Sequence, residues 1–279
     1  MSSGGILNSF GATIPSARAW AFLLAYDGPH ANKEARLDQR GQVTTVIGFD
    51  LGDTLIRYEG VPQSWSPRYR EAIAAAAESS GRWTGELETG RAVAVLERYN
   101  TRLAPRVQEV CEREIFGEVT VALGFPAGDC RMVADAFFSF YRRQVTAYPE
   151  TIATLRQLKC LGVEVGVLTD VPYGMERTRV EADLAAAGID GLVSVVLTSV
   201  EVGARKPAPV GFARLASDLG VEIGDLIYIG NEEKDIEGAN GAGARSVLID
   251  REELRPRWGA WARVKRLDKI FGLLCQPCD

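Results

Sequence analysis

Residues 44–55 read TTVIGFDLGDTL, a β-branched and apolar run that stops at an aspartate, Asp50. A short, nearly continuous apolar run is typical of a buried strand in a parallel sheet. Four similar runs follow along the chain, at residues 163–169, 192–198, 226–230 and 246–249. Stretches with apolar residues at helical intervals separate most of these runs. Strands that alternate with helices predict an α/β fold built on a doubly wound parallel sheet.

The connection between the first two predicted strands is far longer than an ordinary crossover. It holds four segments whose apolar residues recur at helical intervals, at residues 69–77, 90–103, 107–115 and 129–145. We therefore expect an inserted, all-helical domain at residues 57–147. The α/β core would consist of residues 43–56 and 148–279, preceded by an N-terminal extension at residues 1–42.

Polar side chains gather where four of the predicted strands end. In chain order the clusters contain Asp50, Gly52 and Asp53, then Thr169 and Asp170, then Lys206, and finally Asn231 and Asp235. The carboxyl ends of parallel strands meet at one edge of the sheet, where such folds bind their ligands. We therefore expect all four clusters to share one crevice.

A carboxylate, a hydroxyl and an ammonium group in one crevice suit the transfer of a phosphoryl group. A carboxylate can attack phosphorus and form an aspartyl phosphate. Its negative charge repels the phosphate, so a divalent cation is needed, and Mg²⁺ takes oxygen ligands from carboxylates, amides and carbonyls. A hydroxyl and an ammonium group can then hold the phosphoryl oxygens and offset charge in the transition state.

Four segments in order strengthen this interpretation: FDLGDTL, VLTD, ARKPAP and IGNEEKD. Together they resemble the four motifs of the haloacid dehalogenase superfamily, over roughly residues 43–56 and 148–250. The resemblance implies a Rossmann-like core with a helical cap inserted after the first motif, where the long insertion lies. It also implies an Mg²⁺-dependent phosphohydrolase that acts on a small phosphorylated metabolite through an aspartyl-phosphate intermediate.

The resemblance also implies a role for each residue at the phosphate. Asp50 would be the nucleophile, and Thr169 and Lys206 would hold the phosphoryl group. Gly52 and Asp170 would lie beside the same phosphate. Asp50, Thr169 and Lys206 are therefore expected catalytic residues, and Asp53 is the fourth candidate for a catalytic role.

The metal ligands implied by the resemblance come from the first and fourth motifs. They are Asp50, the backbone carbonyl of Gly52, Asn231 and Asp235. Asn231 stands where the family more often has an aspartate. An amide oxygen still binds Mg²⁺, but it contributes less charge than a carboxylate.

The first motif departs from the family pattern at a second position. The family usually has an aspartate two residues after the nucleophile, which acts as general acid and base, but this chain has Gly52 there and Asp53 one residue later. Glycine cannot protonate a leaving alkoxide, a step worth ~10²–10⁴ in rate. Successive side chains of an extended segment point to opposite sides. Asp53 is thus either a catalytic proton-transfer group or a residue that satisfies backbone donors in the turn.

Two other functions remain open on these residues. Gly52 and Asn231 allow a catalytically weak binding or regulatory protein that retains the fold. A 2-haloacid dehalogenase shares the aspartyl nucleophile, but the acidic fourth motif is better explained by a metal. Trp65 and Tyr69, which follow the first motif, either line the substrate entrance or pack within the cap.

Composition excludes several other classes. The net charge is −5 with no basic stripe, which argues against nucleic acid as a main partner. No apolar stretch approaches the ~20 residues that span a bilayer, so no membrane partner is expected. Five dispersed cysteines among 279 residues predict reduced thiols and a cytoplasmic location. The single histidine, His30, leaves no basis for a histidine triad. The sequence does not set the oligomeric state.

Overall fold

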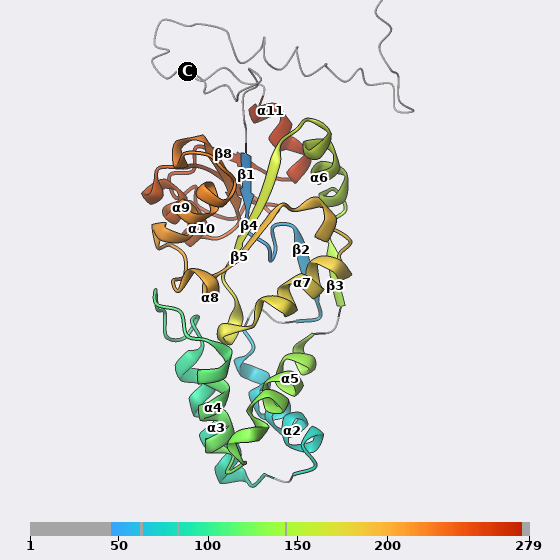
Figure 1. Cartoon of the computed structure of the whole chain (residues 1–279), viewed down its shortest axis with the longest axis vertical. Coiled ribbons are helices and arrows are strands. Elements are labelled where there is room, and N and C mark those ends of the chain that lie inside the picture. Colours follow the sequence, from blue (N-terminus) through green and yellow to red (C-terminus); the bar gives the residue numbers. More distant parts are fainter. Residues whose placement is uncertain (1–45, 62–63, 83, 143, 275–279) are drawn as a thin grey trace, which may run out of the picture.

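The computed structural model describes residues 46–274, except 62–63, 83 and 143 (Figure 1). The extension predicted at residues 1–42, with His30, lies outside the described residues. Six parallel strands form one sheet in the order β5-β4-β1-β6-β7-β8. They are β1 (Val46–Phe49), β4 (Glu164–Thr169), β5 (Val195–Thr198), β6 (Leu226–Gly230), β7 (Arg245–Ile249) and β8 (Ala262–Val264). The predicted α/β fold with a doubly wound parallel sheet is confirmed.

Helices cover both faces of this sheet. Side chains alternate along each strand, so each strand presents apolar side chains to both faces, and helices bury them. On β4, Val165 and Val167 face one cluster of buried residues and Leu168 faces the other. α9 (Pro209–Asp218) packs on the Leu168 side, beside α10 (Glu233–Ala242). α6 (Thr151–Cys160) and α7 (Arg177–Ala186) cover the opposite face. The remaining helices of the core are the short α8 (Ser199–Val202) and α11 (Phe271–Leu274).

Four helices form a separate lobe beyond the carboxyl edge of the sheet, at the bottom of Figure 1. They are α2 (Tyr69–Ser79), α3 (Glu86–Tyr99), α4 (Glu112–Ala122) and α5 (Cys130–Tyr141). We call this lobe the cap. The described residues also contain short 3₁₀ helices, at Ser66–Arg68, Ala127–Asp129, Pro172–Gly174, Asp190–Leu192, Ile223–Asp225 and Leu267–Ile270.

The helix predicted at residues 107–115 is wrong over its first half, because α4 begins only at Glu112. The preceding segment is extended and pairs with a loop of the core. The backbone N–H of Arg205 donates to the carbonyl of Val107 (2.7 Å), and that of Glu109 donates to the carbonyl of Gly203 (3.1 Å). Tertiary hydrogen bonds have therefore overridden the local helical pattern.

An antiparallel ribbon joins the cap to the core. It pairs β2 (Ile56–Glu59) with β3 (Gln144–Ala147), and Tyr58 lies opposite Val145. The predicted helix at residues 129–145 is consequently too long, since α5 ends at Tyr141 before β3 begins. The ribbon places Tyr58 immediately beside the first motif.

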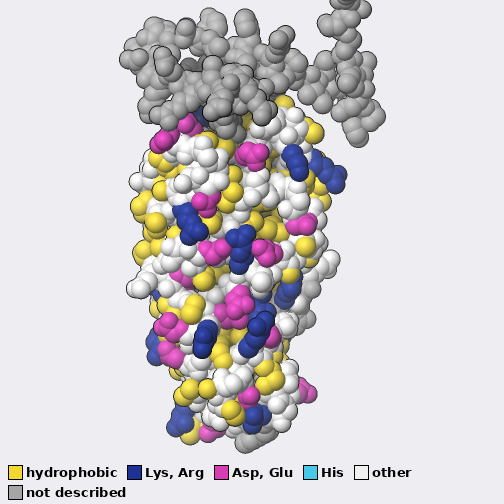
Figure 2. All heavy atoms as spheres, viewed as in Figure 1, with side chains coloured by type: hydrophobic (Ala, Val, Ile, Leu, Met, Phe, Trp, Pro, Cys, Tyr) yellow, Lys and Arg dark blue, Asp and Glu magenta, His cyan; other side chains and the backbone are white. Residues whose placement is uncertain are grey.

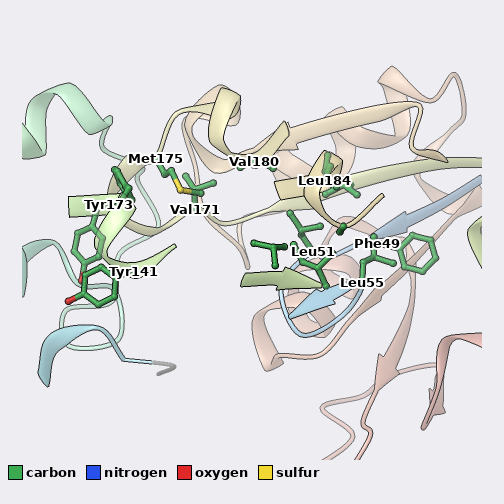
Figure 3. Close-up of a cluster of buried hydrophobic side chains, with 14 of the residues drawn as sticks. Phe49, Leu51, Leu55, Tyr141, Val171, Tyr173, Met175, Val180 and Leu184 are labelled. Atoms are coloured by element: carbon green, nitrogen blue, oxygen red, sulfur yellow. The ribbon is translucent and has the colours of Figure 1, made fainter. Parts of the chain in front are cut away.

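Buried apolar side chains run without interruption from the core into the cap. Figure 3 shows Phe49, Leu51 and Leu55 at one end of this cluster and Tyr141 and Tyr173 at the other. The outer surface shown in Figure 2 mixes acidic and basic side chains, with no patch of one sign. Across the part of the chain that the structure describes, none of the helices has the length and apolar character of a membrane span.

Two glycines at the centre of the sheet form a slot for a side chain of α9. Gly48 of β1 pairs with Gly166 of β4. A Cβ at position 48 would lie 2.7 Å from Cδ2 of Leu215 and 2.8 Å from Cδ2 of Tyr228. Both distances are shorter than any relaxed carbon contact, so the core has no room for even one methyl group here.

We expect Gly48→Ala to destabilise the protein by about 1–3 kcal/mol, the usual cost of overpacking a core. The matched control is Gly117→Ala in α4, where an added Cβ meets nothing within 4 Å. That control should gain up to about 1 kcal/mol, because alanine is the better helix former. Urea midpoints of the two variants measure both effects. Equal midpoints for Gly48→Ala and the wild type would show that Leu215 can move away.

Candidate active site

The predicted nucleophile lines a cleft between core and cap. Asp50 directly follows β1, and its backbone N–H donates to the carbonyl of Ile229 on the neighbouring strand (2.8 Å). Its side chain accepts a hydrogen bond from Nζ of Lys206 at 2.6 Å. Lys206 Nζ also donates to Asp235 (2.5 Å) and lies 3.2 Å from the hydroxyl oxygen of Tyr228. Three of the four predicted clusters thus meet at one ammonium group.

Burial and neighbouring charges shift the pKa values of Asp50 and Lys206. Burial raises the pKa of Asp50 to about 7, although Lys206 acts in the opposite direction. Burial also disfavours the ammonium of Lys206, but Asp235 and Asp50 outweigh it and raise the pKa of Lys206 well above its usual value. Lys206 is therefore a cation held against a carboxyl group that ionises less readily than ordinary aspartate.

Asp235 is already fully engaged by protein donors. Its Oδ2 accepts from the backbone N–H groups of Asn231 (3.0 Å) and Glu232 (2.9 Å) at the start of α10. Its Oδ1 accepts from Lys206, and the residue is completely buried. The structure therefore places Asp235 where it orients Lys206 and the fourth motif, with both oxygens in use.

Oxygen ligands suited to Mg²⁺ converge around the hydroxyl of Thr54. Thr54 Oγ1 lies 3.4 Å from Asp50 Oδ2 and 3.2 Å from the side-chain amide of Asn231. With its nitrogen turned inward, that amide also reaches the carbonyl oxygen of Gly52 at 3.3 Å. Among the residues that the structure describes, no three His, Cys, Asp or Glu side chains form a metal cluster.

These donors fit Mg²⁺, which takes carboxylate, amide and carbonyl oxygens. Asp50, the carbonyl of Gly52 and the amide oxygen of Asn231 would hold the ion, once the amide rotates to present its oxygen. Such a set carries a single carboxylate. Its affinity for Mg²⁺ should accordingly be lower than that of a site with two carboxylates.

The second motif contributes one residue that faces the cleft and one that braces a loop. Thr169 ends β4 and lines the cleft beside Asp50. Asp170 Oδ1 accepts from the backbone N–H of Lys206 (3.1 Å), and its Oδ2 lies 3.2 Å from Nζ of Lys234. Burial opposes ionisation of Asp170, but Lys206 and Lys234 outweigh it and lower the pKa of this carboxyl. Asp170 therefore fixes the position of Lys206.

Of the two residues that depart from the family pattern, Gly52 and Asp53, the aspartate has an unusual backbone conformation. Asp53 has a φ of 57°, the left-handed conformation that glycine adopts most easily. Its carboxylate is exposed, and the hydroxyl of Tyr148 donates to it at 3.5 Å. At Gly52 an added Cβ would lie 3.9 Å from the ring of Tyr58. The glycine thus occupies the position at which a side chain would fit, and the aspartate occupies the strained one.

The cleft has a volume of about 820 Å³, within the range of small-molecule sites. Trp65 lines this cleft, which agrees with one of the two roles predicted for that residue, a place at the substrate entrance. Tyr69 instead packs in the cap core, where it is 1% exposed and hydrogen bonds to Asn100 and Tyr173. Tyr69 therefore belongs to the buried core and not to the lining of the cleft.

Sequence reasoning missed a buried carboxylate of the cap that contacts the third motif. The side chain of Glu109 is 1% exposed and accepts hydrogen bonds from Arg205, Ser199 (2.5 Å) and Arg106 (3.1 Å). The segment around it was predicted to be helical, and that pattern gives no sign of a contact with the third motif. Nothing in the sequence could have predicted this contact.

A second missed group lines the same cleft. Tyr58 donates from its hydroxyl to Oδ2 of Asp183 (2.9 Å), and Nε of Arg142 lies 2.8 Å from Oδ1. A signal for Asp183 did exist. It shares a helical face with Val180 and Leu184, where a carboxylate is unusual.

Comparison with solved structures shows the same fold. The chain covers 98% of a 2-haloacid dehalogenase from Pseudomonas syringae pv. Tomato, with 83% of its own length, a TM-score of 0.58 and 22% identity. It covers 97% of a predicted phosphoglycolate phosphatase from Haemophilus somnus, with 82% of its own length, a TM-score of 0.53 and 20% identity. At this identity the likeness concerns the fold alone.

Curated relatives match over part of the chain. Identity is 35% over 143 residues with the phosphoserine phosphatase of Thermus thermophilus, covering 51% of this chain and 55% of that protein. It is 32% over 127 residues with the ribulose-1,5-bisphosphate 5-phosphatase of Halopiger xanaduensis, covering 45% and 52%. The chain thus spans about half the length of these relatives. The profile of one family, haloacid dehalogenase-like hydrolase, matches residues 44–243, well over half of the chain. The protein belongs to the haloacid dehalogenase-like hydrolase family.

Proposed function

We propose that this protein is a phosphatase, an Mg²⁺-dependent phosphohydrolase that acts on a small phosphorylated metabolite. The observation that carries the proposal is the carboxylate of Asp50, which is held 2.6 Å from Lys206 in the cleft. A nucleophile beside a fixed cation suits attack on a phosphate ester. Phosphatases among the relatives support the same activity.

In the proposed mechanism, Asp50 attacks phosphorus in line with the leaving oxygen. The P–O bond of the ester breaks as the bond to Asp50 forms, which gives an aspartyl phosphate. Thr169 and Lys206 hold the equatorial oxygens. Water then attacks phosphorus and releases Asp50 with inorganic phosphate.

Mg²⁺ would neutralise the carboxylate and the phosphate so that they can approach each other. Asp50, the Gly52 carbonyl and Asn231 are its proposed protein ligands, and Asp235 has the supporting role of orienting Lys206. Asp53 is proposed to stabilise the turn, since its carboxylate is exposed. The cap, proposed to comprise residues 57–147, would select the substrate.

We also propose a cytoplasmic location and no nucleic-acid partner. The cysteines that the structure describes, Cys111, Cys130 and Cys160, are free thiols, as in a reducing compartment. The mixed charges of the surface in Figure 2 offer no basic stripe for a polyanion.

The test is phosphate release from a panel of phosphorylated metabolites, with Mg²⁺ and with chelator. The panel includes the esters named for the relatives, phosphoserine and ribulose 1,5-bisphosphate, with other short-chain phosphates. We expect release that chelator abolishes and added Mg²⁺ restores.

Two results would redirect the assignment. Gly52 in place of the usual acid favours a weakly catalytic binding protein, and folded protein that binds esters without releasing phosphate would support that reading. Metal-independent release of chloride from a 2-haloacid would identify a dehalogenase.

A further inference from the structure

Position 52 leaves the proposed reaction without its usual proton donor. An alkoxide is a poor leaving group, and protonating it contributes roughly 10²–10⁴ in rate. Whatever supplies that proton must lie in the same cleft as Asp50. The space beside Gly52 is bordered by the ring of Tyr58, whose Cε2 would be 3.9 Å from a Cβ at position 52.

Tyr58 is linked to a buried carboxyl group. It lies on β2, and its hydroxyl oxygen is 2.9 Å from Oδ2 of Asp183 on α7. Asp183 is 3% exposed, and its other oxygen lies 2.8 Å from Nε of Arg142 without the alignment of a hydrogen bond. Tyr58, Asp183 and Arg142 all line the cleft that contains Asp50 and Lys206.

The charges around this pair favour a held proton. Burial raises the pKa of Asp183, with Arg142 and the Tyr58 hydroxyl acting against it. Burial and the neighbouring Asp183 raise the pKa of Tyr58 well above its usual value. Arg179, one turn earlier on α7, is already paired with Glu112 and Asp135. The phenol therefore stays protonated, and Asp183 holds a proton more readily than an exposed aspartate.

We propose that Tyr58 and Asp183 form the proton-transfer pair that replaces the missing acid at position 52, an inference that rests on the proposed phosphatase activity. As the ester P–O bond breaks, the Tyr58 hydroxyl gives its proton to the leaving oxygen. For this transfer the hydrogen bond between the two residues reverses: the Tyr58 hydroxyl turns from Oδ2 of Asp183 to the leaving oxygen, and the carboxyl proton, carried on Oδ2 of Asp183, passes to the phenolic oxygen across the 2.9 Å contact. Asp183 is then an anion that Arg142 stabilises.

The second step restores the pair. Water loses a proton to the Tyr58 oxygen as it attacks the aspartyl phosphate, and the phenolic proton returns to Asp183. Tyr58 is thus the catalytic residue, because it meets the reacting oxygen. Asp183 is the proton reservoir behind it, and Arg142 is a positioning residue.

The experiment compares two esters that differ in their need for an acid. An alkyl phosphate requires protonation of its leaving oxygen, whereas the anion released from p-nitrophenyl phosphate is stable without it. We expect Asp183→Asn and Tyr58→Phe to lower kcat/KM about 10²-fold or more for the alkyl ester. The decrease in kcat/KM for the aryl ester should be at least about tenfold smaller, because its leaving group departs without needing a proton. Glu181→Gln, an exposed site on the same helix, is the matched control.

A rescue variant separates chemistry from structure. The backbone of Gly52 accepts a side chain, since its Cβ would meet nothing closer than 3.9 Å. Gly52→Asp in the Asp183→Asn background should therefore recover hydrolysis of the alkyl ester.

Each remaining outcome has a distinct meaning. Equal losses on both esters, or no rescue with a folded protein, would overturn the proton-transfer pair and leave the phosphatase proposal standing. Wild-type protein that hydrolyses neither ester would overturn the proposed function, and the pair with it.

Discussion

Asp50→Asn is expected to abolish phosphate release while leaving the chelated protein at least as stable as the wild type. Removal of a covalent nucleophile costs on the order of 10⁴–10⁶ in kcat. Asparagine keeps the shape of the side chain and an acceptor oxygen for Lys206. The loss would therefore reflect the missing nucleophile and not a collapsed site.

The stability arm of this prediction follows from the pKa of Asp50. Its value in the folded protein is about 7, against 3.8 for an unperturbed aspartate, so the folded state binds the proton more tightly. The proton's stabilising contribution is complete below the unfolded-state pKa of 3.8, and it is lost as the pH rises through the folded-state pKa of about 7. Asparagine is neutral throughout and bears no such loss.

The measurement is the difference in Tm between Asp50→Asn and the wild type, in chelator, from pH 5 to pH 8. We expect the variant to gain on the wild type as the pH rises. Asp218→Asn, at an exposed site paired with Arg214, is the control and should show no such trend. A variant that loses stability as the pH rises would contradict the assignment of Asp50 as a desolvated carboxyl.

Lys206→Met is expected to have the largest effect on folding of any substitution in the site. Lys206 is 2% exposed at its side chain and lies between two carboxylates, at 2.6 Å from Asp50 and 2.5 Å from Asp235. Removing one partner of a buried ion pair costs about 3–5 kcal/mol, because a buried charge is left without compensation. The loss should be greatest at high pH, where Asp50, whose pKa is raised to about 7, is ionised.

A matched lysine and a double variant make this prediction sharp. Lys234 also contacts two carboxylates, Asp170 at 3.2 Å and Glu232 at 2.8 Å, but its side chain is 33% exposed. Lys234→Met should therefore cost less, closer to the ~1 kcal/mol of a solvated pair. Adding Asp50→Asn to Lys206→Met should restore part of the lost stability. Urea unfolding of the four proteins tests this, and equal costs at both lysines would refute it.

The sequence predicts the central sheet well because its strands are buried on both faces and read as apolar runs. Two features lacked that signal. β8 has three residues, and the ribbon strands β2 and β3 have four each and are partly exposed. Such short pairings are fixed by tertiary contacts and not by composition.

The candidate site could be predicted as a set of residues but not as a network. Strand ends in a parallel sheet must meet, so Asp50, Thr169, Lys206 and Asn231 were expected to share a cleft. Spacing alone does not reveal that both oxygens of Asp235 are occupied by donors. Nor does spacing reveal the contacts of Glu109 with Arg205 and of Asp183 with Tyr58, because each of them joins segments that are distant in the sequence.

The pairing of Val107 and Glu109 with the loop that precedes Lys206 bears on how this chain can be recombined. The Glu109 carboxylate is a counterion of Arg205, whose side chain is 6% exposed. A cap taken from a relative without an acid at that position would leave Arg205 buried and missing its hydrogen-bonded carboxylate. The lobes are therefore not interchangeable modules. A chimera of this protein has to carry Glu109 and Arg205 together, or exchange both.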